Sequence, residues 1–182
     1  MKKYIYNNYN ICIKEAPPYS FNPTDNKPYD KVIVIEKKEF NKAIELEIEQ
    51  GGEVKTVSLV VPYDTPLKTF AAPHKDGVFM MLNNILCVFV PETACITKQT
   101  QINPMGTMFE VHPIEDDYIL YGEMEIYRVS KELIVEWEFS GRDIFVRYQG
   151  NEPAFLMKND RICLYDFEDN YYEIDFEGKL IT

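Results

Sequence analysis

Residues 44–49 read IELEIE, with an apolar side chain at every second position and a glutamate between. Gly51 and Gly52 follow almost directly. Successive side chains of a β-strand point to opposite faces of the sheet, so this stretch would bury one face and leave the other in water. A helix over residues 36–50, with Gly51 at its C-cap, is the alternative, but it would point Leu46 away from the apolar face. The alternation and the paired glycines favour a β-hairpin.

The same two-residue period recurs along the chain, for example in residues 133–139 and 171–176. Turn-forming pairs such as Ser140-Gly141 separate the runs, and aromatic residues, which favour strands, make up 14% of the chain. We expect strands at residues 2–6, 9–14, 31–36, 43–50, 53–61, 77–82, 85–90, 107–112, 117–128, 131–139, 143–149, 154–158, 161–167 and 171–176. The sequence therefore predicts an all-β fold of mostly antiparallel hairpins, arranged as a sandwich or a partly open barrel. At most one or two short helices are expected, one of them near residues 66–72.

Two stretches are expected to be irregular. Residues 17–30 contain four prolines among polar residues and are interpreted as a surface connection. Residues 91–105 are the best candidate for a boundary inside the chain. We therefore expect residues 1–182 to form one globular domain, with 1–90 and 107–182 as possible subdomains.

The charge of the chain is lopsided. Of its 182 residues, 19 are basic and 30 are acidic, which gives a net charge of −11. Residues 1–90 contain 11 basic and 11 acidic residues, whereas residues 91–182 contain 8 and 19. A concentrated negative field repels phosphate backbones and anionic membrane surfaces. We therefore expect the chain not to bind nucleic acid. The same field attracts basic proteins or cations.

The setting predicted for the chain is the cytoplasm. No apolar run approaches the roughly 20 residues that span a bilayer. Asn7 and Asn8 interrupt the stretch after the first lysines, where a signal peptide would need an apolar run. Cys12, Cys87 and Cys163 lie between apolar neighbours and are expected to be buried, unreactive thiols in a reducing compartment.

Motifs for catalysis, metal binding and cofactor binding are missing from the sequence. There is no G-x-S-x-G elbow, no phosphate-binding glycine loop and no C-x-x-C pair. His74 is expected in an exposed loop, and His112 at the end of a strand with a backbone partner. We therefore expect no catalytic residue, no metal site and no cofactor, and interpret the protein as a non-enzyme. A hydrolase that uses paired carboxylates is the alternative.

Acidic and aromatic residues gather in the second half, and they are the candidate partner-binding residues. On alternating strand positions, Tyr171, Glu173 and Asp175 would share one side, where tyrosine beside carboxylates suits the recognition of arginine or lysine. A cation site at the acidic clusters is the alternative use of these groups. The full set predicted to bind a partner is Glu115, Asp116, Asp117, Asp166, Glu168, Asp169, Tyr171, Glu173 and Asp175.

In size, in its lack of catalytic motifs, and in the acidic aromatic run of residues 165–176 together with the acidic residues 115–117, the chain resembles the small acidic immunity proteins of bacterial toxin systems. Those proteins bind and block a cognate toxin and are not enzymes. The resemblance implies a binding protein whose acidic, tyrosine-rich second half docks a basic protein partner. The alternative is a β-domain that binds a small molecule or a carbohydrate in a pocket lined by aromatic residues. The sequence leaves the oligomeric state open.

Overall fold

The computed structural model describes residues 2–67, 70–148 and 152–182. These residues form β-strands and one short 3-10 helix, η1 (Pro23–Asp25), and they contain no α-helix. The predicted all-β fold is confirmed. No helix in the described part of the chain has the length and apolar character to cross a membrane.

The strands form four sheets, numbered here in chain order. Sheet 1 contains, in spatial order, β1 (Lys2–Tyr6), β2 (Tyr9–Tyr19), β4 (Asn41–Gln50), β5 (Glu53–Pro62) and β3 (Lys31–Val34). Sheet 2 contains β6 (Ala71–His74), β7 (Gly77–Leu82), β8 (Ile85–Val90) and β9 (Cys95–Gln101). Sheet 3 contains β10 (Met108–Ile114), β11 (Asp117–Gly122), β12 (Glu125–Val129) and β13 (Val135–Ser140), and sheet 4 contains β14 (Phe155–Met157), β15 (Arg161–Tyr165) and β16 (Tyr171–Asp175). Neighbouring strands pair antiparallel except β3 and β5, which pair parallel.

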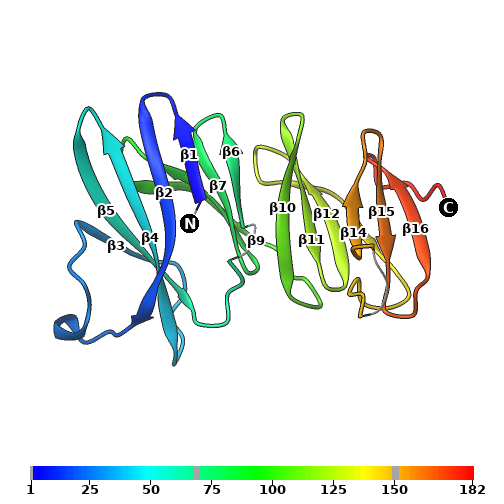
Figure 1. Cartoon of the computed structure of the whole chain (residues 1–182), viewed down its shortest axis with the longest axis horizontal. Helices are drawn as coiled ribbons and strands as arrows, with labels where there is room; N and C mark the ends of the chain where they lie inside the picture. The colour runs from blue at the N-terminus through cyan, green and yellow to red at the C-terminus, as the bar shows by residue number, and fades with distance from the viewer. Residues whose placement is uncertain (1, 68–69, 149–151) are drawn as a thin grey trace.

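The four sheets follow one another along the long axis of the molecule in chain order (Figure 1). Three clusters of buried apolar side chains lie between them: one joins sheets 1 and 2, one joins sheets 2 and 3, and one joins sheets 3 and 4. The described strands close no barrel. Each inner sheet is therefore covered on both faces, whereas each end sheet keeps one outer face.

Strand β7 shows why the inner sheets have continuous apolar runs. Val78 and Met80 pack in the cluster shared with sheet 1, while Phe79 and Met81 pack in the cluster shared with sheet 3. All six residues of β7 are buried. A strand with two covered faces loses the alternation that a half-exposed strand keeps.

The hairpin predicted at residues 44–52 is confirmed. β4 pairs antiparallel with β5 through ten residue pairs. Gly51 and Gly52 have φ angles of +59° and +89°, a conformation in which glycine has no steric penalty. The expectation that the glutamates of this run lie in water holds only in part, because Glu45 is buried and pairs with Lys27 at 2.8 Å.

Several expected element boundaries are wrong. The expected strand 117–128 is two strands, β11 and β12. The expected strand 143–149 does not form over residues 143–148, and residue 149 lies outside the described residues. The helix expected near residues 66–72 does not form in the described part of that segment, where β6 begins at Ala71; residues 68–69 lie outside the described residues. Residues 91–105 are not irregular, because β9 lies within them and completes sheet 2.

Candidate functional site

The candidate site is the outer face of sheet 4, at the end of the stack. Phe155, Leu164 and Tyr172 are paired across the sheet and point inward to the core shared with sheet 3. The alternate positions therefore point outward. In one cross-strand row these are Leu156, Cys163 and Glu173, and in the next they are Tyr165 and Tyr171.

The C-terminal residues extend this face by one more strand position. Leu180 forms an antiparallel bridge with Ile174, so these two side chains lie on the same face of the sheet. The next residue, Ile181, therefore lies on the outer face. The backbone N–H of Ile181 donates to the carbonyl oxygen of Glu173 at 2.7 Å. Ile181 is 49% exposed, and Leu156 at the other edge is 44% exposed.

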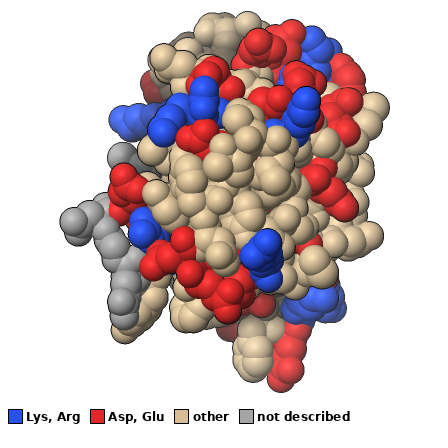
Figure 2. Space-filling view, turned by 90° about the vertical axis from the view of Figure 1, so that its right-hand side faces the viewer, with Lys and Arg blue, Asp and Glu red and all other residues tan. Residues whose placement is uncertain are grey.

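Figure 2 shows this end of the molecule. Uncharged side chains cover the middle of the face, and acidic and basic side chains lie around them. An uncharged centre with a charged rim is the composition expected of a surface that another protein covers. Residues 152–182 contain three basic and eight acidic residues, a net charge of −5.

Glu173 lies within the outer face and is held by two neighbours. The hydroxyl of Tyr171 and a guanidinium nitrogen of Arg161 both donate to its carboxylate, the latter at 2.8 Å. These two hydrogen bonds hold the pKa of Glu173 below its usual value. Cys163 beneath them is only 3% exposed, and its thiol lies 3.8 Å from Glu173 Oε1.

Arg147 borders the same face from the loop before β14. Its guanidinium carbon lies 4.1 Å from the centre of the Tyr165 ring, and its Nε donates to Asp169 Oδ1 at 2.7 Å. The hydroxyl of Tyr165 donates to Glu152 at 2.9 Å. The rings of Tyr165 and Tyr171 lie 4.9 Å apart. The tyrosines are therefore fixed in place, which reduces the entropy lost when a partner covers them.

The remaining candidate residues of sheet 4 have different surroundings. Asp166 is fully buried and accepts hydrogen bonds from the turn that joins β15 to β16. Asp175 accepts two backbone hydrogen bonds from the turn after β16. Glu168 is exposed at the tip of the β15–β16 turn. The predicted sharing of one side by Tyr171, Glu173 and Asp175 is confirmed by the alternation of β16.

Asp117 is connected to sheet 4, although it belongs to β11 of sheet 3. Arg128 donates to Asp117 Oδ2 at 2.9 Å through Nε. Through another nitrogen it donates to the carbonyl oxygen of Phe176 at 2.8 Å and to Glu177 at 3.1 Å. Arg128 therefore joins the acidic cluster of sheet 3 to the turn that follows β16.

Glu115 and Asp116 lie elsewhere, beside a hollow of about 330 Å³ between turns of sheets 2 and 3. Lys131 lines the same hollow and donates to Asp116 at 2.8 Å. This pairing holds the pKa of the Asp116 carboxyl below its usual value. The structure thus brings six of the nine predicted residues together in sheet 4, links Asp117 to them, and separates Glu115 and Asp116.

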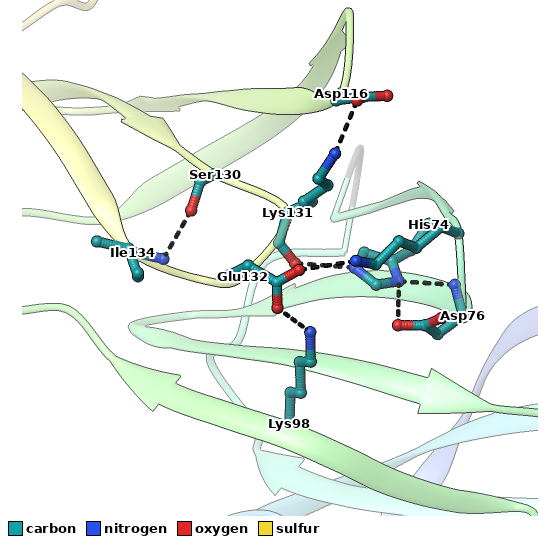
Figure 3. Close-up of polar contacts among 9 residues, drawn as sticks. His74, Asp76, Lys98, Asp116, Ser130, Lys131, Glu132 and Ile134 are labelled. Carbon is teal, nitrogen blue, oxygen red and sulfur yellow. Dashed lines mark hydrogen bonds and ion pairs between the residues drawn. The ribbon is translucent and has the colours of Figure 1, made fainter.

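Figure 3 shows the polar contacts that connect sheets 2 and 3 beside the hollow lined by Glu115 and Asp116. His74 Nδ1 accepts the backbone N–H of Asp76 at 3.0 Å, so the ring proton is on Nε2, which lies 2.9 Å from the carbonyl oxygen of Lys131. Glu132 accepts from Lys75 at 2.7 Å and also from Lys98. These two hydrogen bonds lower the pKa of Glu132 to about 2. The hydrogen bonds and ion pairs of this polar cluster therefore connect sheet 2 to sheet 3.

The expectations for both histidines are wrong. His74 is not exposed in a loop. Only 6% of it is exposed, and it belongs to the polar cluster that connects sheets 2 and 3. His112 lies within β10 and contacts a side chain, since its Nε2 is 3.0 Å from Glu110 Oε2. Its ring stacks on Phe155 at 4.8 Å.

The cysteines are all free. The expected burial is confirmed for Cys87 and Cys163 and is wrong for Cys12, which is partly exposed. In the part of the chain that the structure describes, no three His, Cys, Asp or Glu side chains are placed to share a metal ion.

A second hollow, of about 410 Å³, lies between sheets 3 and 4. Phe109, Tyr121 and Phe155 line it together with Arg147 and Glu152. The Tyr121 ring stacks on Phe155 at 4.7 Å and meets Phe109 edge-on at 5.3 Å. This volume lies in the range of about 300–1,000 Å³ that is typical of small-molecule sites.

Fold and surface together define an all-β protein with four stacked sheets and an uncovered end face. No protein-family model matches the chain, and no curated protein matches it. Among solved structures, it is similar to Hsv2 of Kluyvelomyces marxianus, with a TM-score of 0.42 and 8% sequence identity. That match covers 78% of this chain and 43% of Hsv2, so the chain spans less than half the length of that protein.

Proposed function

We propose that this chain is a non-enzymatic binding protein that holds a basic protein partner on the outer face of sheet 4. The observation that carries the proposal is the uncharged centre of this face within a charged rim (Figure 2), with the paired Tyr165 and Tyr171 on the same face. Tyrosine is enriched among the residues that dominate protein interfaces.

Charge complementarity selects the kind of partner. Arg161 and Arg147 neutralise Glu173 and Asp169 within the protein, but acidic residues still exceed basic ones by five in residues 152–182. A basic surface would meet this excess and would be steered toward it over a range of about one Debye length. An immunity-like inhibitor, which covers a positive site of a toxin in the bacterial cytoplasm, has this mode of action. The four free thiols suit such a reducing compartment.

The test compares two exposed apolar residues at opposite ends of the stack. Leu156→Lys puts a positive charge on the proposed face, at its β14 edge, whereas Ile5→Lys puts one on the outer face of sheet 1, where Ile5 is 79% exposed. In a capture experiment from lysate of the source cells, wild type and Ile5→Lys should retain the same basic protein, and Leu156→Lys should lose it. With the purified partner, Leu156→Lys should weaken binding about tenfold or more.

Salt provides the second readout of the same proposal. The association rate of the wild type with its partner should fall as ionic strength rises, because screening shortens the reach of the acidic rim. Equal retention of the partner by both lysine variants, or an association rate that salt leaves unchanged, would contradict the proposal.

The aromatic hollow favours a second candidate function, the binding of a carbohydrate or another small ring-shaped molecule. Titration of the protein with a panel of mono- and disaccharides, followed by NMR, should shift the signals of residues around Phe109, and Phe109→Ala should abolish the shifts. Phe40→Ala, at a phenylalanine that is 70% exposed in sheet 1's connecting loop, is the matched control and should leave them intact. A panel that shifts no signal at the hollow would rule out this class of ligand.

A further inference from the structure

Two reactive side chains meet where the edges of sheets 1 and 2 come together. Lys31 is the first residue of β3, at one edge of sheet 1, and Cys95 is the first residue of β9, at one edge of sheet 2. The Nζ atom of Lys31 lies 2.7 Å from the Sγ atom of Cys95. Both residues are partly exposed, so small oxidants in solvent reach the pair.

The contact is close for these atom types. Hydrogen bonds from nitrogen to oxygen span about 2.7–3.2 Å, and sulfur is the larger acceptor. The Cys95 thiol also donates to the carbonyl oxygen of Thr93 at 3.2 Å, which fixes its orientation. The hydrogen bond from Lys31 holds the pKa of Cys95 below its usual value. The thiolate is the form of cysteine that reacts with oxidants.

We propose that Lys31 and Cys95 are a covalent modification site, at which hydrogen peroxide joins Sγ to Nζ through one bridging oxygen atom. The observed separation is too long for a direct S–N bond and leaves room for a single small atom between the two. The site is independent of the proposed docking face, because it lies at the opposite end of the stack.

The reaction consumes two molecules of peroxide. In the first step the thiolate attacks one peroxide oxygen and the O–O bond breaks, so that Cys95 becomes a sulfenic acid. The departing hydroxide takes a proton from the Lys31 ammonium and leaves as water, and Nζ becomes a neutral amine. In the second step the sulfenic oxygen bonds to Nζ of the neutral amine, and the hydroxyl hydrogen and one amine hydrogen are removed. The second peroxide takes up those two hydrogens and leaves as two water molecules. Each peroxide accepts two electrons, so sulfur and nitrogen together lose four.

The bridge would fasten two sheets at their edges. Lys31 and Cys95 are 64 positions apart in the chain, and a covalent link that closes so long a loop restricts the unfolded chain strongly. We therefore expect the denaturation midpoint of the oxidised protein to lie above that of the reduced protein.

The experiment treats the full-length protein with hydrogen peroxide and maps its peptides by mass spectrometry. The expected product is a cross-linked pair of peptides, carrying Lys31 and Cys95, that has gained one oxygen and lost two hydrogens. Lys31→Arg keeps the positive charge beside the thiol but has no primary amine, so it should give sulfenic or sulfinic acid at Cys95, no cross-link and no rise in the midpoint.

Cys12 is the internal control, because it is partly exposed and has Lys3 opposite it in β1, but no lysine of the described residues donates a hydrogen bond to its thiol, and its neighbour Lys14 is paired with Glu47 at 2.5 Å. It should form no cross-link. If the cross-linked peptide pair has lost two hydrogens but gained no oxygen, the two side chains are joined directly, and the proposed oxygen bridge is wrong. Oxidation of Cys95 to an acid alone in the wild type, or its capture in a disulfide, would overturn the proposal.

Discussion

Asp166→Ala is expected to lower the free energy of unfolding by about 3 kcal/mol, because it removes a buried carboxylate that several donors share. Asp166 has no exposed surface. Its oxygens accept the backbone N–H groups of Glu168 at 3.1 Å and Asn170 at 2.9 Å, and the hydroxyl of Tyr172 at 2.7 Å. Thermal denaturation should show a melting temperature lower by roughly 6–12 °C.

The pH dependence of this effect has a definite sign. Burial pushes the pKa of Asp166 upward, but the hydrogen bonds from Tyr172, Asn170 and Glu168 outweigh it and hold the pKa below the usual value. The unfolded chain has the ordinary value of about 3.9. The contribution of Asp166 is therefore complete above that pH and is lost as the pH falls through the lower, folded value. Denaturant titrations of wild type and variant should therefore give a smaller difference in unfolding free energy in acid than at neutral pH.

Glu168→Ala is the matched control for this prediction. Glu168 is an exposed carboxylate two residues away in the same turn, so its loss should change stability by no more than about 0.5 kcal/mol. Equal destabilisation by the two variants, or a difference that persists unchanged in acid, would contradict the role assigned to Asp166. Any loss of partner binding in Asp166→Ala should then follow from the loosened turn.

The sequence predicts the hairpins whose faces differ in polarity. In residues 44–49 the glutamates differ so strongly in polarity from the isoleucines and the leucine that only one strand register buries the apolar set, and β4 adopts it. β9 was missed because polar residues occupy both of its faces: Lys98 and Thr100 alternate with Gln99 and Gln101. β6 was missed because Pro73 lies within it, and proline is tolerated only at the edge of a sheet, where β6 is found.

The residues of the candidate site also fall into two groups, those that the local sequence pattern predicts and those that only the tertiary fold brings to the face. Tyr171, Glu173 and Asp175 were predictable from local alternation, and the register of the β15–β16 hairpin adds Tyr165 opposite Tyr171. Arg147 gives no local signal, because it lies outside any strand and reaches Tyr165 only through the tertiary fold. Ile181 likewise becomes part of the face only after Leu180 bridges to β16. Contacts between distant segments depend on how sheets stack, which local periodicity does not encode.

Phe145→Ala should have an effect at least as large as that of Asp166→Ala, with a loss of about 3–5 kcal/mol. Phe145 is fully buried between sheets 3 and 4, although the segment around it forms no strand. Its ring lies 6.2 Å from Phe139 and 6.0 Å from Tyr172. Alanine would leave a cavity where sheet 4 rests on sheet 3. Hydrogen exchange should therefore accelerate more in β15 and β16 than in β7 and β8.

Two further variants separate the loss of packing from the loss of an aromatic ring. Phe145→Leu fills most of the cavity and should cost less than about 1.5 kcal/mol. Phe40→Ala removes the same side chain from a site that is 70% exposed and should leave stability almost unchanged. If exchange in Phe145→Ala rises equally in all four sheets, the stack unfolds as one cooperative unit and Phe145 is not the specific anchor of sheet 4. If it rises in sheet 4 alone, the proposed docking face depends on this one loop residue, and partner affinity should fall in Phe145→Ala while it is retained in Phe40→Ala.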